Sequence, residues 1–284
     1  MRLVDSHGHL NSDRFDDDVD QVIGGAQLAG LERILVPGWN HHSSSRALEL
    51  AEARPWLDAA VGVHPHDAAK VTHEEWADIR RWADDARVVA IGETGLDSDR
   101  MFSPWPMQLE NLRRNLDLAL ATGKPAILHC RSKMGERDAQ DALVAELRAA
   151  GFAGERAQAA FGERPPAIIH SFSGPVDYAA EVIAMGLAVS FSGLVYRQGE
   201  ESSASAAVLV PSARLLVETD APFLAPPGSP KGRNMPANVA ITAAWVAGRR
   251  GIAQSDEAGL AAFGDSLVAA YDRVFGIRTR DIRI

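Results

Sequence analysis

The side chains that could do chemistry in this chain are histidines and carboxylates beside short apolar runs. His7 and His9 stand two residues apart at the end of the first run. Side chains at i and i+2 of a strand point to the same face, so both imidazoles can reach one metal ion. A solvated turn with two histidines has the same spacing, and H-x-H alone leaves both interpretations open.

Further groups of the type that binds metals stand at the ends of later apolar runs. They are Glu93, His129, His170 and Asp220, at the ends of the fourth, fifth, sixth and eighth runs. A buried carboxylate needs a compensating positive charge, which a bound cation supplies. Six such groups at five strand ends predict a metal site.

The number of groups bears on the number of ions. Six exceed the four ligands of one tetrahedral zinc ion. Two divalent ions roughly 3.5–4 Å apart would use all six, with Glu93 as the bridge because both of its oxygens can bind. The alternative is one ion, with the spare groups acting as base and substrate contacts. Histidine-rich ligation suits zinc, manganese or nickel, whereas magnesium prefers oxygen ligands.

The runs that carry these residues are continuously apolar and β-branched, as expected of parallel strands buried on both faces. There are eight, over residues 2–7, 33–38, 57–64, 88–93, 125–130, 167–172, 187–193 and 215–220. Amphipathic segments at helical spacing separate them, at 16–30, 43–53, 73–85, 105–123, 138–151 and 175–186.

Eight strand–helix units predict one α/β domain over residues 1–284, a (β/α)8 TIM barrel with the metal site at the C-terminal ends of its strands. An open doubly wound sheet is the alternative, but no G-x-G-x-x-G follows the first run. Loop insertions are expected at 131–138 and 152–166, with a polar stretch at 199–206.

Composition narrows the class of protein. The 284 residues are 46% hydrophobic and 24% charged, which is typical of a globular chain, and no apolar run has the roughly 18 residues that a membrane span needs. Cys130 is the single cysteine, so a reducing, cytoplasmic location and no intrachain disulfide are expected. A net charge of −9 argues against a protein that coats nucleic acid, but not against an enzyme that holds one or two phosphates.

The ordered motifs of the chain resemble the TatD family of metal-dependent hydrolases. They are 5-DSHGHL-10, 62-GVHPH-66, 91-IGETGLD-97, 128-LHCR-131, 170-HSFSG-174, 190-SFSG-193, 218-ETDAPFL-224 and 233-RNMPANV-239. The resemblance implies a TIM barrel of the amidohydrolase superfamily and a metal-dependent deoxyribonuclease, commonly a 3′→5′ exonuclease. It also implies that the six groups are the metal ligands, that Asp220 transfers a proton and that His64 lies beside the substrate.

Two departures from the family pattern fall in loops over the expected site. Ser98 stands after G-L-D, where the family has an aromatic residue, and 132-SKMGE-136 interrupts the segment after H-x-R. Both leave the metal ligands in place and bear on the choice of substrate.

Other residues give weaker signals for substrate contact. His64 and His66 end the third run on one face, and contact with substrate is weighed against turn and cap roles around the intervening proline. Arg131 suits a phosphate, or an ion pair with a neighbouring acid. Trp105, in the segment after the fourth run, is a candidate platform for stacking a base.

Three residues near the eighth run complete the expected site. Arg233 and Asn234 could hold a phosphate or pin their Pro/Gly-rich loop. Glu218, two residues before Asp220, is expected one layer deeper in the barrel, where it would orient a ligand histidine.

The leading hypothesis is therefore a monomeric two-metal hydrolase that acts on phosphodiesters, with the 3′ end of DNA as substrate and Asp220 and Glu93 as catalytic groups. A hydrolase of amides, esters or lactones is the alternative, because one fold hosts many chemistries. Many amidohydrolases bridge their metals with a carboxylated lysine late in strand four, and Glu93 at that position favours the phosphodiesterase. A non-catalytic binding protein fits the complete ligand set least well.

Overall fold

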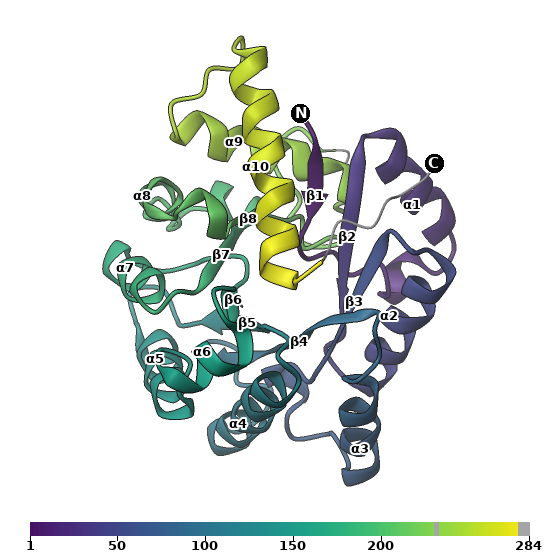
Figure 1. Cartoon of the computed structure of the whole chain (residues 1–284), viewed down its shortest axis with the longest axis vertical. Helices are drawn as coiled ribbons and strands as arrows, with labels where there is room; N and C mark the ends of the chain where they lie inside the picture. Colours follow the sequence, from purple (N-terminus) through teal and green to yellow (C-terminus); the bar gives the residue numbers. More distant parts are fainter. Residues whose placement is uncertain (230–232, 278–284) are drawn as a thin grey trace.

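The computed structural model of the chain describes residues 1–229 and 233–277. Eight parallel strands form one sheet in sequence order. They are β1 Leu3–Asp5, β2 Leu31–Pro37, β3 Leu57–Val61, β4 Val88–Asp97, β5 Ala126–Arg131, β6 Ala167–Ile169, β7 Ala188–Phe191 and β8 Leu215–Val217. The residues after β1 and β8 join the two edges, because Ser6 N donates to Val217 O (3.1 Å) and Asp220 N to His7 O (2.8 Å). The prediction of a (β/α)8 barrel is confirmed (Figure 1).

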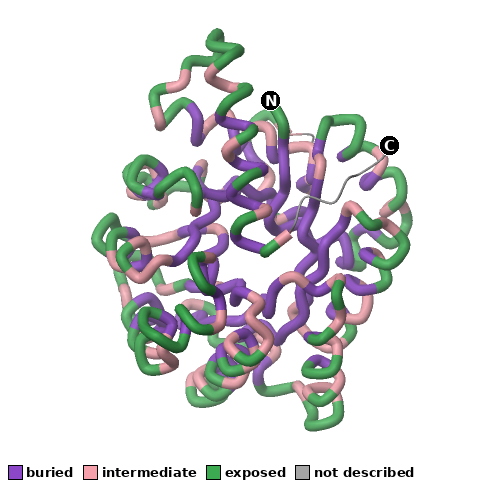
Figure 2. The backbone as a smooth tube through the Cα atoms, viewed as in Figure 1, coloured by how far each residue is buried: buried purple, intermediate pink, exposed green. Residues whose placement is uncertain are grey.

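Helices surround the strands, so that the buried part of the chain follows the barrel wall and exposed residues lie on the outside (Figure 2). They are α1 Val19–Leu28, α2 His41–Ala53, α3 His73–Trp82, α4 Trp105–Thr122, α5 Asp138–Ala150, α6 Glu155–Phe161, α7 Val176–Ala184, α8 Ser203–Leu209, α9 Val239–Arg249 and α10 Glu257–Phe275. Within the described residues, none of these helices has the length and apolar character needed to cross a bilayer.

Three local features differ from the expectation. β4 continues to Asp97, so Glu93 lies within the strand rather than at its end. The segment 152–166 holds helix α6, whose Ala157 and Phe161 are buried at i, i+4 spacing among charged residues that gave it the composition of a loop. The polar stretch 199–206 contains the start of α8, where small serine and alanine side chains carry little amphipathic signal.

A buried polar network ties the early parts of β2 and β3 to α10. Arg33 Nε donates to Asp58 Oδ2 (2.7 Å), and the Tyr271 hydroxyl donates to the same oxygen (2.8 Å). Burial, followed by the charge of Asp58, raises the pKa of Tyr271 well above its usual value, so the hydroxyl keeps its proton. The network closes the N-terminal end of the barrel, the end that contributes to stability rather than chemistry.

We predict that Asp58→Ala lowers the free energy of unfolding by about 3–5 kcal/mol, because it leaves the Arg33 guanidinium buried without its partner. Tyr271→Phe removes one hydrogen bond and should cost about 1 kcal/mol. Urea unfolding of both variants measures the loss, with metal content unchanged in each. A loss below about 1 kcal/mol for Asp58→Ala would contradict the role of this ion pair.

Candidate metal centre

The six predicted ligand groups converge at the C-terminal ends of the strands. His7 and His9 follow β1, His170 follows β6 and Asp220 follows β8. Glu93 and His129 lie within β4 and β5. The structure thus brings together groups that are up to 213 residues apart in the chain, from His7 to Asp220.

One face of the Glu93 carboxylate is directed at the groups from β1 and β8. Its Oε2 lies 3.3 Å from His7 Nε2 and 3.7 Å from His9 Nε2. Asp220 Oδ1 lies 3.1 Å from His9 Nε2 and 3.7 Å from His7 Nε2. His7, His9 and Asp220 thus form one group of ligand-type atoms that lie within 4.8 Å of one another, and His7, Glu93 and His170 form another.

The other oxygen of Glu93 is directed at β5 and β6. Oε1 lies 2.8 Å from His170 Nε2 and 3.4 Å from His129 Nδ1. The two imidazole nitrogens nearest to this oxygen therefore come from β5 and from the end of β6, and both are atoms of metal-ligand type.

The outer nitrogens of these two histidines show which ring atom is free to bind a metal. His129 Nε2 lies 3.2 Å from Asp97 Oδ2, and His170 Nδ1 lies 3.3 Å from Glu218 Oε1. A carboxylate accepts, so in a neutral ring the proton lies on the outer nitrogen, and the inner nitrogen that faces Glu93 is free to bind a metal ion. When the ring is protonated, the inner nitrogen donates to Glu93 instead. His170 Nε2 is buried and faces Glu93 Oε1 at 2.8 Å, the position that a metal ligand would need.

His64 reaches the same oxygen of Glu93 in a different protonation state. Its Nε2 lies 3.2 Å from Glu93 Oε1, while its Nδ1 accepts a hydrogen bond from His66 N (3.1 Å). The proton of the neutral ring therefore sits on Nε2, which donates to Glu93 and has no lone pair for a metal. Burial lowers the pKa of His64 to about 4, so the ring is neutral at pH 7.

The electrostatics of the centre favour a cation. Burial raises the pKa of Glu93, but the surrounding histidines, with the charge of His170 first, outweigh it, and the pKa lies well below its usual value. Burial lowers the pKa of His170, yet Glu93 and Glu218 raise it well above the usual value. The carboxylates thus draw positive charge into a buried site, as a site for divalent ions requires.

A glycine sets the close approach of the two strands that carry Glu93 and His129. Gly95 has φ +141°, and a Cβ there would lie 1.9 Å from His129 O. A side chain at this position would push β4 and β5 apart. Gly95 therefore keeps Glu93 and His129 on closely spaced strands.

Two carboxylates that support the site were not among the predicted residues. Asp5 accepts from His7 N (3.2 Å), Thr219 N (2.9 Å) and Thr219 Oγ1 (2.5 Å), and so joins the ends of β1 and β8. Burial, opposed by the hydrogen bonds from Thr219, raises the pKa of Asp5 to about 8. Asp97 is the second, and it also lies 2.7 Å from His66 Nε2. Both lie within motifs quoted in the sequence analysis, and their position next to candidate ligand residues could have indicated that they support the site.

Two further residues singled out in the sequence lie below the metal centre and at its rim. Glu218 is fully buried between His170 and Ser190, one layer below the ligands, as expected. Arg131 Nε lies 2.9 Å from Asp99 Oδ2, so the arginine forms the ion pair that the sequence analysis gave as an alternative to phosphate binding. About half of its side chain is exposed at the rim of the site.

Arg233 and Asn234 pin the loop after β8, which is one of the two roles that the sequence left open for them. Asn234 has no exposed surface and donates to Thr219 O (2.8 Å). Arg233 donates to Arg14 O, pairs with Asp18 and lies 4.5 Å from the centre of the Phe15 ring. The contacts of both side chains in this structure hold the loop.

Fold and site together define a metal-dependent hydrolase built on a (β/α)8 barrel. The sequence model of the family described as TatD related DNase matches residues 4–260, and the chain belongs to this family. The resemblance drawn from the motifs is confirmed.

Relatives and solved structures agree with this assignment. The chain is 36% identical over 245 residues to the uncharacterized metal-dependent hydrolase YabD of Bacillus subtilis (strain 168), covering 86% of this chain and 90% of that protein. It is 37% identical over 258 residues to the 3′-5′ ssDNA/RNA exonuclease TatD of Enterobacter lignolyticus (strain SCF1), covering 88% and 92%. The crystal structure of YjjV, a TatD homolog from Escherichia coli K12, matches with a TM-score of 0.83 at 25% identity, covering 98% and 99%.

We predict that Glu218→Gln weakens metal binding about 10–100-fold, because the amide no longer fixes the proton of His170 on Nδ1 as a carboxylate does. Competition against a chromophoric chelator measures the affinity. Glu181→Gln, a carboxylate of α7 that pairs with Arg137 and Arg148, is the matched control. An affinity within about twofold of wild type would show that Glu218 does not orient a ligand.

We predict that His64→Ala lowers kcat at least about tenfold while the metal content stays at the wild-type value, because Nε2 carries a proton and is no ligand. Elemental analysis of the dialysed protein gives the ratio of metal to chain. Loss of one equivalent would make His64 a ligand and overturn the assignment of its proton.

Proposed function

We propose that the chain binds two divalent ions that share Glu93. The first is held by His7, His9 and Asp220 with Glu93 Oε2, and the second by His129 and His170 with Glu93 Oε1. The observation that carries this proposal is the position of the Glu93 carboxylate, whose two oxygens face different sets of ligand atoms. The nitrogen-rich sets suit zinc, manganese or nickel better than magnesium.

The proposed reaction is hydrolysis of a phosphodiester at the 3′ end of single-stranded nucleic acid. Relatives that are named 3′-5′ ssDNA/RNA exonucleases support this substrate class. Divalent ions held by these residues would supply Lewis-acid chemistry, polarising phosphoryl oxygens and lowering the pKa of a bound water. Glu93 replaces the bridging lysine of many amidohydrolases, which supports the phosphodiester over an amide or lactone.

Asp220 is the proposed proton acceptor. It follows β8 with φ +53°, a conformation that Asp adopts more readily than most residues, and its side chain keeps 15% of its surface exposed. Burial raises the pKa of Asp220, but the hydrogen bond from His9 and the charges of His9, His7 and His170 lower it below the usual value. The carboxylate is thus ionised at neutral pH and can accept a proton from the attacking water and return it to the leaving oxygen.

The rim supplies the proposed substrate contacts. His64 donates its Nε2 proton to Glu93 beside the substrate, and His66 lies next to it. The exposed part of Arg131 is placed to meet a phosphate. A monomeric state, a single domain and a cytoplasmic location belong to the same proposal. The single cysteine supports the location.

The experiment that tests the proposal supplies the metal-loaded protein with single-stranded DNA labelled at the 3′ or the 5′ end. RNA and a panel of amides and lactones are assayed in parallel. Stepwise release of nucleotides from the 3′ end is expected. Turnover of an amide or lactone without cleavage of nucleic acid would overturn the proposed substrate.

We predict that Glu93→Gln holds at most one ion and loses almost all activity at ordinary metal concentration, because the bridging charge offsets the repulsion of two nearby cations. Activity alone does not decide, since a one-metal enzyme with Glu93 as base would lose it too. Metal stoichiometry decides: wild type should bind two ions per chain. A variant that still binds two ions with similar affinity contradicts the bridge, and a wild type that saturates at one ion contradicts the two-metal centre.

A further inference from the structure

Two phenylalanine side chains stand exposed at the mouth of the metal centre. Every Trp, Tyr and Phe of the chain lies within the described residues, and of these Phe102 and Phe223 are exposed, at 62% and 47%. All the other aromatic side chains are buried or partly buried. An exposed apolar ring forgoes the stabilisation that burial gives, and its face is free to contact a ligand.

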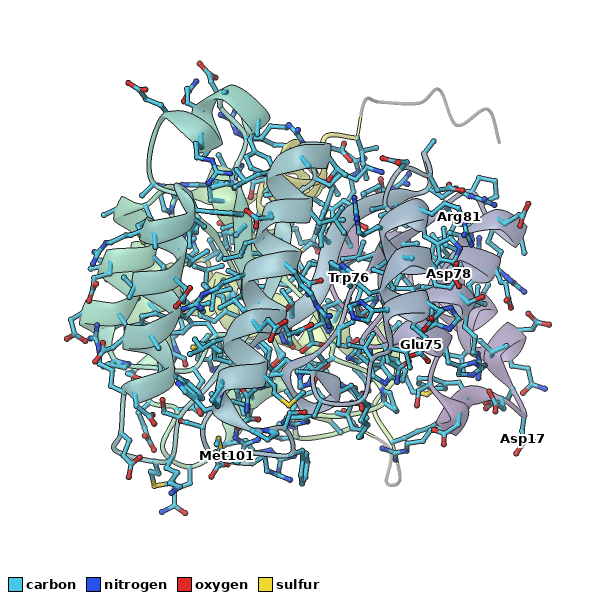
Figure 3. All side chains as sticks on the ribbon, turned by 90° about the horizontal axis from the view of Figure 1, so that it is seen from below. Asp17, Glu75, Trp76, Asp78, Arg81 and Met101 are labelled. Carbon is cyan, nitrogen blue, oxygen red and sulfur yellow. The ribbon has the colours of Figure 1, made fainter. Side chains whose placement is uncertain are left out.

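Both rings belong to loops at the C-terminal face and contact histidines of the centre. Phe102 lies between β4 and α4, and its ring meets that of His66 at 4.7 Å and 77°. Phe223 lies after β8 and meets the His9 ring at 5.9 Å and 75°. Met101, the neighbour of Phe102, lies at the lower edge of the molecule in Figure 3 and is itself exposed.

The metal-ligand groups lie between the two phenylalanines. A continuous series of ring contacts, with centroids 4.1–5.9 Å apart, joins them in the order Phe102, His66, His64, His129, His170, His7, His9, Phe223. Phe102 and Phe223 are therefore the two ends of this series, with the Glu93 carboxylate near its middle.

The exposed aromatic residue of the loop after β4 is Phe102. It is neither residue 98, where the family has an aromatic side chain, nor Trp105, the candidate platform. Ser98 replaces the aromatic residue after G-L-D, and its hydroxyl donates to Asp138 at the start of α5 (2.7 Å). Trp105, the candidate platform, is partly buried and packs against the core in the first turn of α4. Phe102 is the exposed aromatic ring of this loop.

We propose that Phe102 and Phe223 stack the nucleobases on either side of the phosphodiester that is cleaved. This inference rests on the proposed function and specifies how the site selects its substrate. Stacking of bases on aromatic rings is typical of single-strand recognition and tolerates any sequence. In a duplex the faces of the bases are already covered by their neighbours, so the two rings select unpaired ends.

The test compares two 5′-labelled single-stranded oligonucleotides of one sequence with the metal-loaded full chain. One carries normal bases, and the other has abasic tetrahydrofuran units at its last two 3′ positions. Wild type should show a KM about tenfold lower for the normal oligonucleotide. Phe102→Ala and Phe223→Ala should each reduce this preference, and the double variant should abolish it.

Two further variants separate stacking from a general effect of the surface. Phe102→Trp should retain the preference, because it keeps an aromatic face. Leu28→Ala removes another exposed apolar side chain, at the end of α1, and should match wild type on both oligonucleotides.

The outcomes distinguish this inference from the proposed function. If the alanine variants keep the wild-type preference, or lose the same factor on both oligonucleotides, neither ring stacks a base and the inference is wrong. A patch that instead binds another protein would give the first of these results. A wild type that cleaves neither oligonucleotide overturns the proposed function itself.

Discussion

The centre depends on one buried negative charge. Glu93 is 3% exposed and lies inside a barrel wall of apolar strands, where an isolated carboxylate would cost several kcal/mol. Imidazoles surround it, and their contacts of 2.8–3.4 Å come from β1, β3, β5 and β6. The position of each strand end is thus constrained by the need to compensate this charge, and a site built to compensate it also attracts cations.

A second layer of carboxylates fixes how the histidines use their two nitrogens. Asp97 and Glu218 hold the protons of His129 and His170 on the side away from Glu93. His64 has a backbone N–H at the corresponding place, and its proton is turned toward Glu93 instead. Histidines at similar distances from one carboxylate are thereby divided into candidate metal ligands and a hydrogen-bond donor by the partner of the outer nitrogen.

The barrel and the convergence of the six candidate ligand groups could be predicted from the sequence because each signal is local. Continuous apolar runs indicate buried parallel strands, and a histidine or acid next to such a run must lie at a strand end. The roles of Asp5 and Asp97 could not be predicted in this way, since they depend on which strand ends meet in space. The sequence likewise left two roles open for Arg233 and Asn234, because the contacts of their loop with Thr219 and Arg14 depend on the fold and not on the loop's own composition.

Buried carboxylates at the two ends of the barrel have different partners. This difference explains why the metal centre tolerates so many carboxylates. At the N-terminal end, Asp58 is matched by a permanent cation, Arg33, and by a hydroxyl, so its charge is already compensated. At the C-terminal end, Glu93, Asp97, Glu218 and Asp220 face histidines, whose charge depends on protons and can be replaced. Arginine in place of these histidines would also compensate the carboxylates. Its guanidinium does not lose its proton, however, so it would exclude a metal ion. Imidazole neutralises the carboxylates when protonated and, once neutral, offers a lone pair to a metal ion. The same side chains can therefore support folding before a metal binds and coordinate it afterwards.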